Sequence, residues 1–163
     1  MFSWLAEVVM PYIDPFQFGC VKQSSNTHAL VLLVHCWLAD LETPNTMIRT
    51  CLIDFSKAFD RVDYNILLYK LSILGIPPIL LNWCSSFFKN RQQRIKMGPY
   101  KSTWRRVIAG VPQESKLGTL FFFVMVNDLR CEAPLYKYVD DCAVTEAIKK
   151  CYLESSKLIA ARN

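Results

Sequence analysis

Two adjacent aspartates inside an apolar segment constrain this chain most strongly. Asp140 and Asp141 follow Tyr138 and Val139, and another apolar segment that ends in Asp54 lies well upstream. Neighbouring carboxylates repel each other and are costly to hold together away from water unless a cation neutralises them. Three carboxylates brought together from two strand ends would form an all-oxygen site for Mg²⁺, a hard cation. Two such ions serve in-line phosphoryl transfer, so the pattern predicts nucleotidyl-transfer chemistry.

The composition indicates a folded domain rather than a disordered or membrane-spanning chain. A length of 163 residues favours one domain, and 52% hydrophobic residues suffice for a core. The longest uncharged apolar run, Leu117–Val126, is about half of the roughly 20 residues that a membrane span needs. No basic region precedes the first apolar stretch, so a signal peptide is not expected. We therefore expect an intracellular protein, in the nucleus or the cytoplasm, that is neither secreted nor membrane-spanning.

The seven cysteines are odd in number and scattered along the chain. They lack the paired two-to-four-residue spacing of zinc sites, and buried reduced thiols are favoured over a disulfide framework.

A net charge of +5 is concentrated in one stretch of the sequence. The basic residues within this stretch are Lys89, Arg91, Arg94, Lys96, Lys101, Arg105 and Arg106. Such a cluster suits a polyanion, and Arg91, Arg94 and Lys96 are the candidates for nucleic-acid contact. The alternative is a solvated hairpin face without a ligand.

Periodicity and capping signals predict alternating helices and strands. Helices are expected over 3–10, 27–41, 64–74, 79–89, 117–129 and 146–161, with Thr27 and Asp63 as N-caps of the second and third. Strands are expected over 46–55, 92–97, 102–108, 135–139 and 142–145, with a turn over 98–101. In the helix over 27–41, five apolar residues share one face: Leu30, Val31, Val34, Leu38 and Leu41.

The order of these elements predicts an α+β fold with an antiparallel sheet and helices packed on one face. A hairpin carries the aspartate pair at its tip. The strand that ends in Asp54 is expected to lie beside this hairpin, so that all three carboxylates gather at one edge.

Three ordered segments closely resemble motifs A, B and C of reverse transcriptases, specifically those of the non-LTR (LINE-like) retrotransposon group. They are Ile53–Asp60, Ala109–Gly118 and Tyr138–Asp141, and residues 17–30 resemble the segment that precedes motif A in that group. The resemblance implies a polymerase palm with parts of the fingers and no thumb. By this resemblance, residues 1–163 would be a partial, truncated reverse transcriptase domain. Residues 1–45 would be a fingers-proximal segment, and residues 46–163 would be the palm.

The resemblance also implies the roles of the acidic residues. Asp54, Asp140 and Asp141 would be catalytic and would bind two Mg²⁺ ions, for which Mn²⁺ could substitute. The carbonyl of Phe55 would be a main-chain ligand. The substrates would be dNTPs, added to a DNA primer on an RNA template.

Further roles follow from the same resemblance. Phe59 would lie under the sugar and exclude a ribose 2′-OH, or it is a core aromatic residue. Gln113 would touch the incoming nucleotide, or it is a turn residue. Tyr138 and Val139 would pack near the primer terminus, or they are ordinary strand residues.

The chain departs from the family pattern at motif B and in the early segment. Glu114 stands where the family has a glycine, Thr119 replaces a proline, and Gln23 replaces a common glycine. Two functional readings follow: an RNA-directed DNA polymerase domain, or a catalytically inactive remnant that binds nucleic acid or a protein partner. An aggregating fragment is a third alternative.

Overall fold

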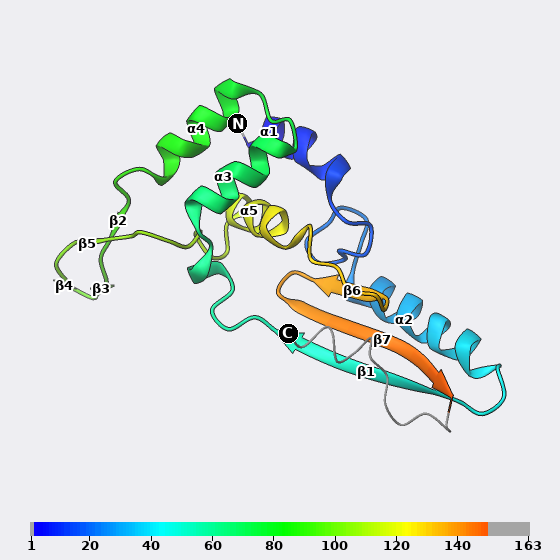
Figure 1. The fold of residues 1–163 in the computed structure, drawn as a ribbon. Coiled ribbons are helices and arrows are strands. Elements are labelled where there is room, and N and C mark those ends of the chain that lie inside the picture. Colours follow the sequence, from blue (N-terminus) through cyan, green and yellow to red (C-terminus); the bar gives the residue numbers. More distant parts are fainter. Residues whose placement is uncertain (1, 150–163) are drawn as a thin grey trace. The chain divides into compact units, whose positions relative to one another are not determined.

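The computed structural model describes residues 2–149, drawn in colour in Figure 1. The chain forms two compact units that interleave along the sequence. One unit contains Met1–Ile13 and Lys57–Asn127, and the other contains Asp14–Ser56 and Asp128–Asn163. These units do not follow the expected sequential division into 1–45 and 46–163, which stays a prediction.

The second unit is built on a three-stranded antiparallel sheet in the order β1-β7-β6 (Figure 1). Strand β1 is Thr46–Asp54, β6 is Leu135–Tyr138 and β7 is Asp141–Lys149. The β1–β7 register runs without interruption from Thr46 opposite Lys149 to Asp54 opposite Asp141. The predicted placement of the Asp54 strand beside the aspartate hairpin is therefore confirmed.

The expectation that a helix begins at Glu146 is wrong. Residues 146–149 continue β7, and the rest of the expected helix, 150–161, lies outside the described residues. The cause is a pairing between distant residues, because Arg49 of β1 holds the buried Glu146 in a salt bridge of 2.7 Å. Full pairing with β1 therefore overrides the helical pattern of the sequence.

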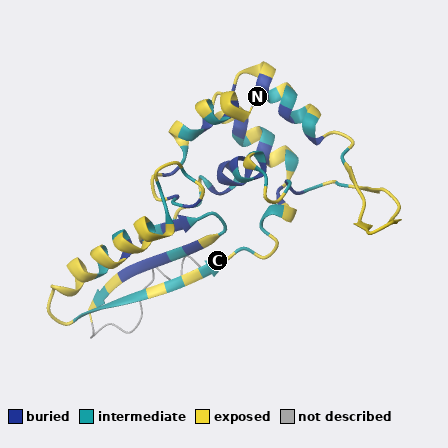
Figure 2. Cartoon of the chain, turned by 180° about the vertical axis from the view of Figure 1, so that it is seen from behind, coloured by how far each residue is buried: buried dark blue, intermediate teal, exposed yellow. Residues whose placement is uncertain are grey.

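Helix α2, Asn26–Leu41, lies along the sheet (Figure 1). Its N-cap is Ser25 rather than Thr27, because Ser25 is extended and its hydroxyl accepts from the backbone N–H of His28 at 3.3 Å. Leu33 is buried, whereas the apolar face predicted from the sequence is exposed, as Figure 2 shows along this helix. Helix α2 is thus amphipathic in sequence but does not bury its apolar stripe within its unit.

The first unit consists of helices packed around α5, Lys116–Val126. The other helices are α1 (Phe2–Val9), α3 (Tyr64–Ile73) and α4 (Pro78–Phe88), with short 3-10 helices η1 (Met10–Tyr12) and η2 (Phe59–Arg61). Helix α5 is apolar on every side, which suits a helix buried at the centre. Its Phe121 is fully buried, as are Leu5, Leu67 and Leu71 of the surrounding helices.

Helix termini in this unit follow the capping chemistry of the sequence. The carboxylate of Asp63 accepts from the N–H groups of Asn65 and Ile66, at 2.8 and 3.1 Å, which confirms the predicted N-cap of α3. Ser115 caps α5 by accepting from Gly118 N–H at 3.0 Å. At the other end of α5, Lys70 Nζ donates to the carbonyl of Met125 at 2.6 Å and complements the helix dipole.

The basic hairpin forms two short ladders instead of the two longer strands expected. Strand β2 (Gln92–Gln93) pairs with β5 (Arg105–Arg106), and β3 (Lys96–Met97) pairs with β4 (Tyr100–Lys101). Between them, the Ser102 hydroxyl accepts from Ile95 N–H at 2.9 Å and interrupts the regular ladder.

Within residues 2–149, no helix is long and apolar enough to span a membrane. The six cysteines in this range are free thiols.

Candidate active site

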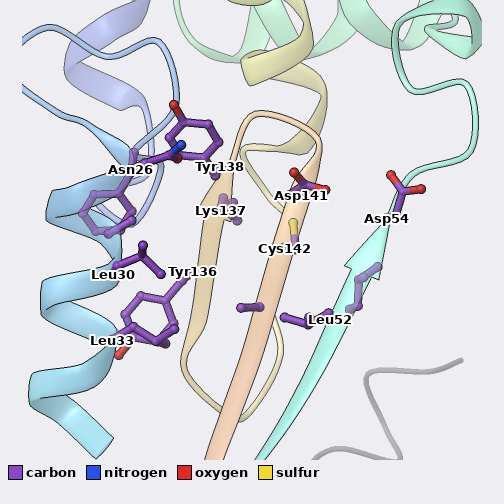
Figure 3. A pocket seen from close by; sticks show the side chains of 14 residues that line it. Asn26, Leu30, Leu33, Leu52, Asp54, Tyr136, Lys137, Tyr138, Asp141 and Cys142 are labelled. Atoms are coloured by element: carbon purple, nitrogen blue, oxygen red, sulfur yellow. The ribbon is translucent and has the colours of Figure 1, made fainter.

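The Asp54 and Asp141 carboxylates lie at the same end of neighbouring strands (Figure 3). Asp54 is the last residue of β1, Asp141 is the first of β7, and the two are direct partners in the register. Both are exposed. Like charges placed directly opposite destabilise a strand pair, so this edge favours a cation between them.

Asp140 lies in the turn between β6 and β7, beside Asp141 in the chain. The turn contains an unusual backbone conformation, because Val139 has a positive φ of 58°. β-Branched residues rarely adopt this left-handed conformation, so the turn must be held by its surroundings. The side chain of Gln17 contacts this turn. No role of its own was predicted for Gln17 from the sequence, and the nearby Gly19 was the feature that could have indicated a close contact here.

The predicted ligand carboxylates differ from other aspartates in what they contact. Asp54, Asp140 and Asp141 make no side-chain hydrogen bond or salt bridge with any described residue. By contrast, the carboxylate of Asp14 binds Lys137 and Arg130, and that of Asp63 caps a helix. The three oxygen donors thus suit a hard cation in chemistry and in availability. Across residues 2–149, however, no three acidic, histidine or cysteine side chains already lie together as a metal cluster.

A pocket of about 540 Å³ opens beside the carboxylates (Figure 3). Its walls come from α2 and from all three strands of the sheet, and include Leu30, Leu33, Leu52, Tyr136 and Tyr138. Cys142 also lines this pocket, and burial raises the pKa of its thiol to about 11. This cysteine therefore stays protonated at neutral pH.

Motif B residues line a separate pocket of about 410 Å³ in the helical unit. Here Gln113 Nε2 donates to the carboxylate of Asp60 at 3.2 Å. Gly110 has a φ of 86°, and a Cβ there would lie 2.8 Å from the carbonyl oxygen of Asp60. The backbone of motif B therefore approaches the end of motif A as closely as only glycine allows.

Phe59, which is predicted to lie under the sugar and exclude a ribose 2′-OH, is in the same unit. Its ring stacks on Phe122 of α5 with the ring centroids 4.8 Å apart, and its side chain is half-buried. This packing fixes the ring and leaves part of it accessible.

Both departures from family glycines fall in left-handed backbone. Glu114 has a φ of 56° and Gln23 a φ of 64°. This region is strained for residues other than glycine, which explains why a glycine suits each position. At Glu114, the backbone conformation is therefore by itself a reason for the glycine of the family.

The predicted nucleic-acid contacts lie in different environments. Arg91 donates to the carbonyl of Gly110 at 3.1 Å, which gives it a role in supporting motif B. Arg94 lies over the ring of Trp104 at 4.5 Å, a cation–π contact on the hairpin. Lys96 is exposed in β3.

Residues 3–160 match the family described as reverse transcriptase (RNA-dependent DNA polymerase). The chain belongs to the reverse transcriptase family. The resemblance read from the sequence is thereby confirmed, and the chain is a reverse transcriptase domain like those of non-LTR elements.

The relatives of this reverse transcriptase are polymerases of mobile elements. It is 32% identical over 156 residues to the RNA-directed DNA polymerase from mobile element jockey of Drosophila melanogaster, which covers 90% of this chain and 17% of the relative. The jockey polymerase of Drosophila funebris is 31% identical over 149 residues, covering 85% and 16%. A probable RNA-directed DNA polymerase from transposon BS of Drosophila melanogaster is 32% identical over 109 residues, covering 61% and 12%. The chain thus spans about a sixth of the length of the jockey relatives it matches.

Proposed function

We propose that this reverse transcriptase domain contributes the palm of an RNA-directed DNA polymerase that extends a DNA primer on an RNA template. The observation that carries the proposal is the direct pairing of Asp54 with Asp141, at an edge where neither carboxylate has a protein partner among the described residues. The activity, substrates and partners that we propose for the whole polymerase are inferred from the similarity of this chain to the jockey relatives.

Asp54, Asp140 and Asp141 would hold two Mg²⁺ ions, or Mn²⁺ in their place, with the carbonyl of Phe55 as a further ligand. When bound, such ions lower the pKa of a primer 3′-OH and neutralise the triphosphate. The chain contributes oxygen ligands at exposed strand ends, where water and substrate have access. Repulsion between the paired carboxylates gives this edge its preference for a cation.

Phe59 and Gln113 would select and hold the dNTP. The half-buried Phe59 ring is fixed by Phe122, so a 2′-hydroxyl would meet a rigid aromatic surface. Gln113 is exposed and oriented by Asp60, which leaves its amide oxygen available to a nucleotide or template. Tyr138 and Val139 would pack against the primer terminus.

Primer extension on a homopolymer RNA template tests the proposal, with the 163-residue chain and with a chain lengthened by the flanking parts of its polymerase. Template-dependent dNTP incorporation is expected in the presence of Mg²⁺. Asp140→Asn should reduce incorporation to background. Asp40→Asn, which alters an exposed acid on α2 and the net charge equally, should retain it.

Equal incorporation by Asp140→Asn and the parent would contradict the proposed site. No incorporation by the lengthened parent chain would favour a second candidate, a non-catalytic remnant that binds nucleic acid. The contact of Arg94 with Trp104 on the exposed hairpin favours that candidate, because cations interleaved with aromatic rings suit single strands. The remnant would bind RNA with an affinity that falls as salt rises.

A further inference from the structure

The segment before α2, residues 14–20, is attached to the hairpin that carries the aspartate pair. Gln17 forms a parallel bridge with Lys137 of β6. Phe18 N–H donates to the carbonyl of Lys137, and Lys137 N–H donates to the carbonyl of Phe16, each at 2.8 Å. The backbone on both sides of Gln17 is therefore fixed against β6.

The side chain of Gln17 reaches from this bridge to the turn. It is only 4% exposed, and its Oε1 accepts from Val139 N–H at 2.9 Å and from Gly19 N–H at 3.1 Å. Its Nε2 is buried without a hydrogen-bond partner in the described part of the chain. The acceptor oxygen is therefore the part of this side chain that the surroundings use.

The bond to Val139 acts on the strained residue of the turn. Val139 has a φ of 58° and directly precedes Asp140 and Asp141. A conformation this unfavourable for a β-branched residue persists only where neighbouring groups hold it. The orientation of Val139 then sets the direction in which both carboxylates leave the turn.

Gly19 brings the segment to the turn at backbone contact distance. A Cβ at this position would lie 2.7 Å from Val139 N and 2.5 Å from its Cγ2. Only a residue without a side chain fits, so Gly19 lets Gln17 reach the turn.

The start of the segment is fixed by charge. The carboxylate of Asp14 contacts Lys137 Nζ at 2.8 Å and Arg130 Nη1 at 2.6 Å, and it accepts from Phe16 N–H at 3.0 Å. Lys137 is 1% exposed, so its ion pair is shielded from solvent. The segment is thus anchored at both ends, with Gln17 between.

We propose that Gln17 is a positioning residue for the polymerase reaction, acting through Val139 on the turn that presents Asp140 and Asp141. The inference rests on the proposed function for its effect on catalysis. The attachment of the turn is measurable without activity.

The test compares Gln17→Met, which removes the acceptor at similar volume, with Gln17→Glu, which keeps an acceptor oxygen and replaces the unpartnered nitrogen. Gln23→Met, at an exposed position three residues beyond this segment, is the matched control. Amide hydrogen exchange at Val139 and Gly19 is measured in the 163-residue chain, alongside urea unfolding. Steady-state primer extension is measured in the lengthened chain.

In Gln17→Met, exchange at Val139 and Gly19 should accelerate about tenfold beyond any change at Val144 in the centre of β7. The value of kcat should fall about tenfold while the KM for dNTP changes less than about twofold, because Gln17 does not touch substrate. Gln17→Glu should restore both towards the parent, and Gln23→Met should leave both unchanged.

Equal acceleration of amide exchange at Val139 and Val144, or a rise in KM with kcat retained, would overturn the positioning role. The substitution would then act only through a general loss of stability. If Gln17→Met does not fold, Gly19→Ala tests the same contact, because the added methyl group must displace Val139. Unchanged exchange at Val139 in that variant would count against the proposal. An inactive parent chain would contradict the proposed function, whereas the exchange data would still decide whether Gln17 holds the turn.

Discussion

At the scale of single residues, backbone conformation explains why glycine suits the two positions where this chain departs from a family glycine. Glu114 and Gln23 occupy left-handed conformations that glycine adopts without strain. The strain is local, so it affects stability whether or not the polymerase is active. Activity and stability can therefore be separated experimentally at these positions.

Restoring glycine at either position should stabilise the fold. Glu114→Gly and Gln23→Gly should each raise the free energy of unfolding by about 0.5–1 kcal/mol, the relief of strain minus the entropy that glycine adds to the unfolded chain. Urea unfolding measures the change. Glu42→Gly is the control, because Glu42 has a φ of −62° and glycine should only destabilise there. A loss of stability in both test variants would contradict the strain.

Removing one of the paired carboxylates should stabilise the metal-free chain and abolish its response to metal. Asp141→Asn relieves the repulsion from Asp54, by about 0.5 kcal/mol. The parent should gain about 1.4 kcal/mol in Mg²⁺ or Mn²⁺ at ten times the Kd, and Asp141→Asn should gain much less. Thermal unfolding with and without metal measures both effects, with Asp40→Asn as the charge-matched control. An equal metal response in the two variants would place the ion elsewhere.

At the scale of elements, short sequence patterns predicted those features that depend on residues close together in the chain. The Asp63 cap, the strand that ends in Asp54 and the central helix α5 were all predicted from short windows of sequence. The extension of β7 through Glu146 was missed, because Arg49 is close to it in space and far from it in sequence. The attachment of residues 14–20 to β6 was missed for the same reason, since a bridge between distant segments leaves no periodic pattern.

The ion pair that anchors this attachment should make stability depend on pH. Burial of Asp14 raises the pKa of its carboxyl, but the hydrogen bonds from Lys137 and Phe16 and the charges of Lys137 and Arg130 outweigh it and hold the pKa below its usual value. The stabilisation is therefore present above about pH 4, where an unfolded aspartate ionises, and is lost as the pH falls through the lower folded pKa.

Asp14→Asn should cost about 3 kcal/mol at pH 7, because Lys137 is deeply buried, and should cost much less near pH 2. Urea unfolding at both pH values measures the difference. Asp40→Asn, an exposed change, should show little dependence on pH by comparison. A cost for Asp14→Asn that is equal at both pH values would contradict a charged anchor.

At the scale of the whole molecule, the exposed apolar face of α2 has the clearest consequence for behaviour in solution. Leu38 is 61% exposed on this face, whereas Leu33 of the same helix is 9% exposed. Large exposed apolar patches promote association. The helix therefore carries one face that stabilises its unit and another that favours self-association.

The two faces should respond differently to substitution. Leu38→Lys should leave the free energy of unfolding within about 0.5 kcal/mol of the parent and reduce self-association. Leu33→Ala should cost about 2–4 kcal/mol, because it removes buried contacts. Light scattering and urea unfolding distinguish the two effects. Unchanged self-association in Leu38→Lys would show that this face is not responsible.

The long β1–β7 pairing also has a consequence for synthesis on the ribosome. The nine residues of β1 emerge early, but their partners in β7 begin only at Asp141. At roughly 5–20 residues per second, β1 waits about 4–17 s with its hydrogen-bonding edge open. An open edge is a template for pairing with other chains. Any nascent chain that stops before Asp141 would therefore release an unpaired β1 strand that lacks the residue opposite Asp54.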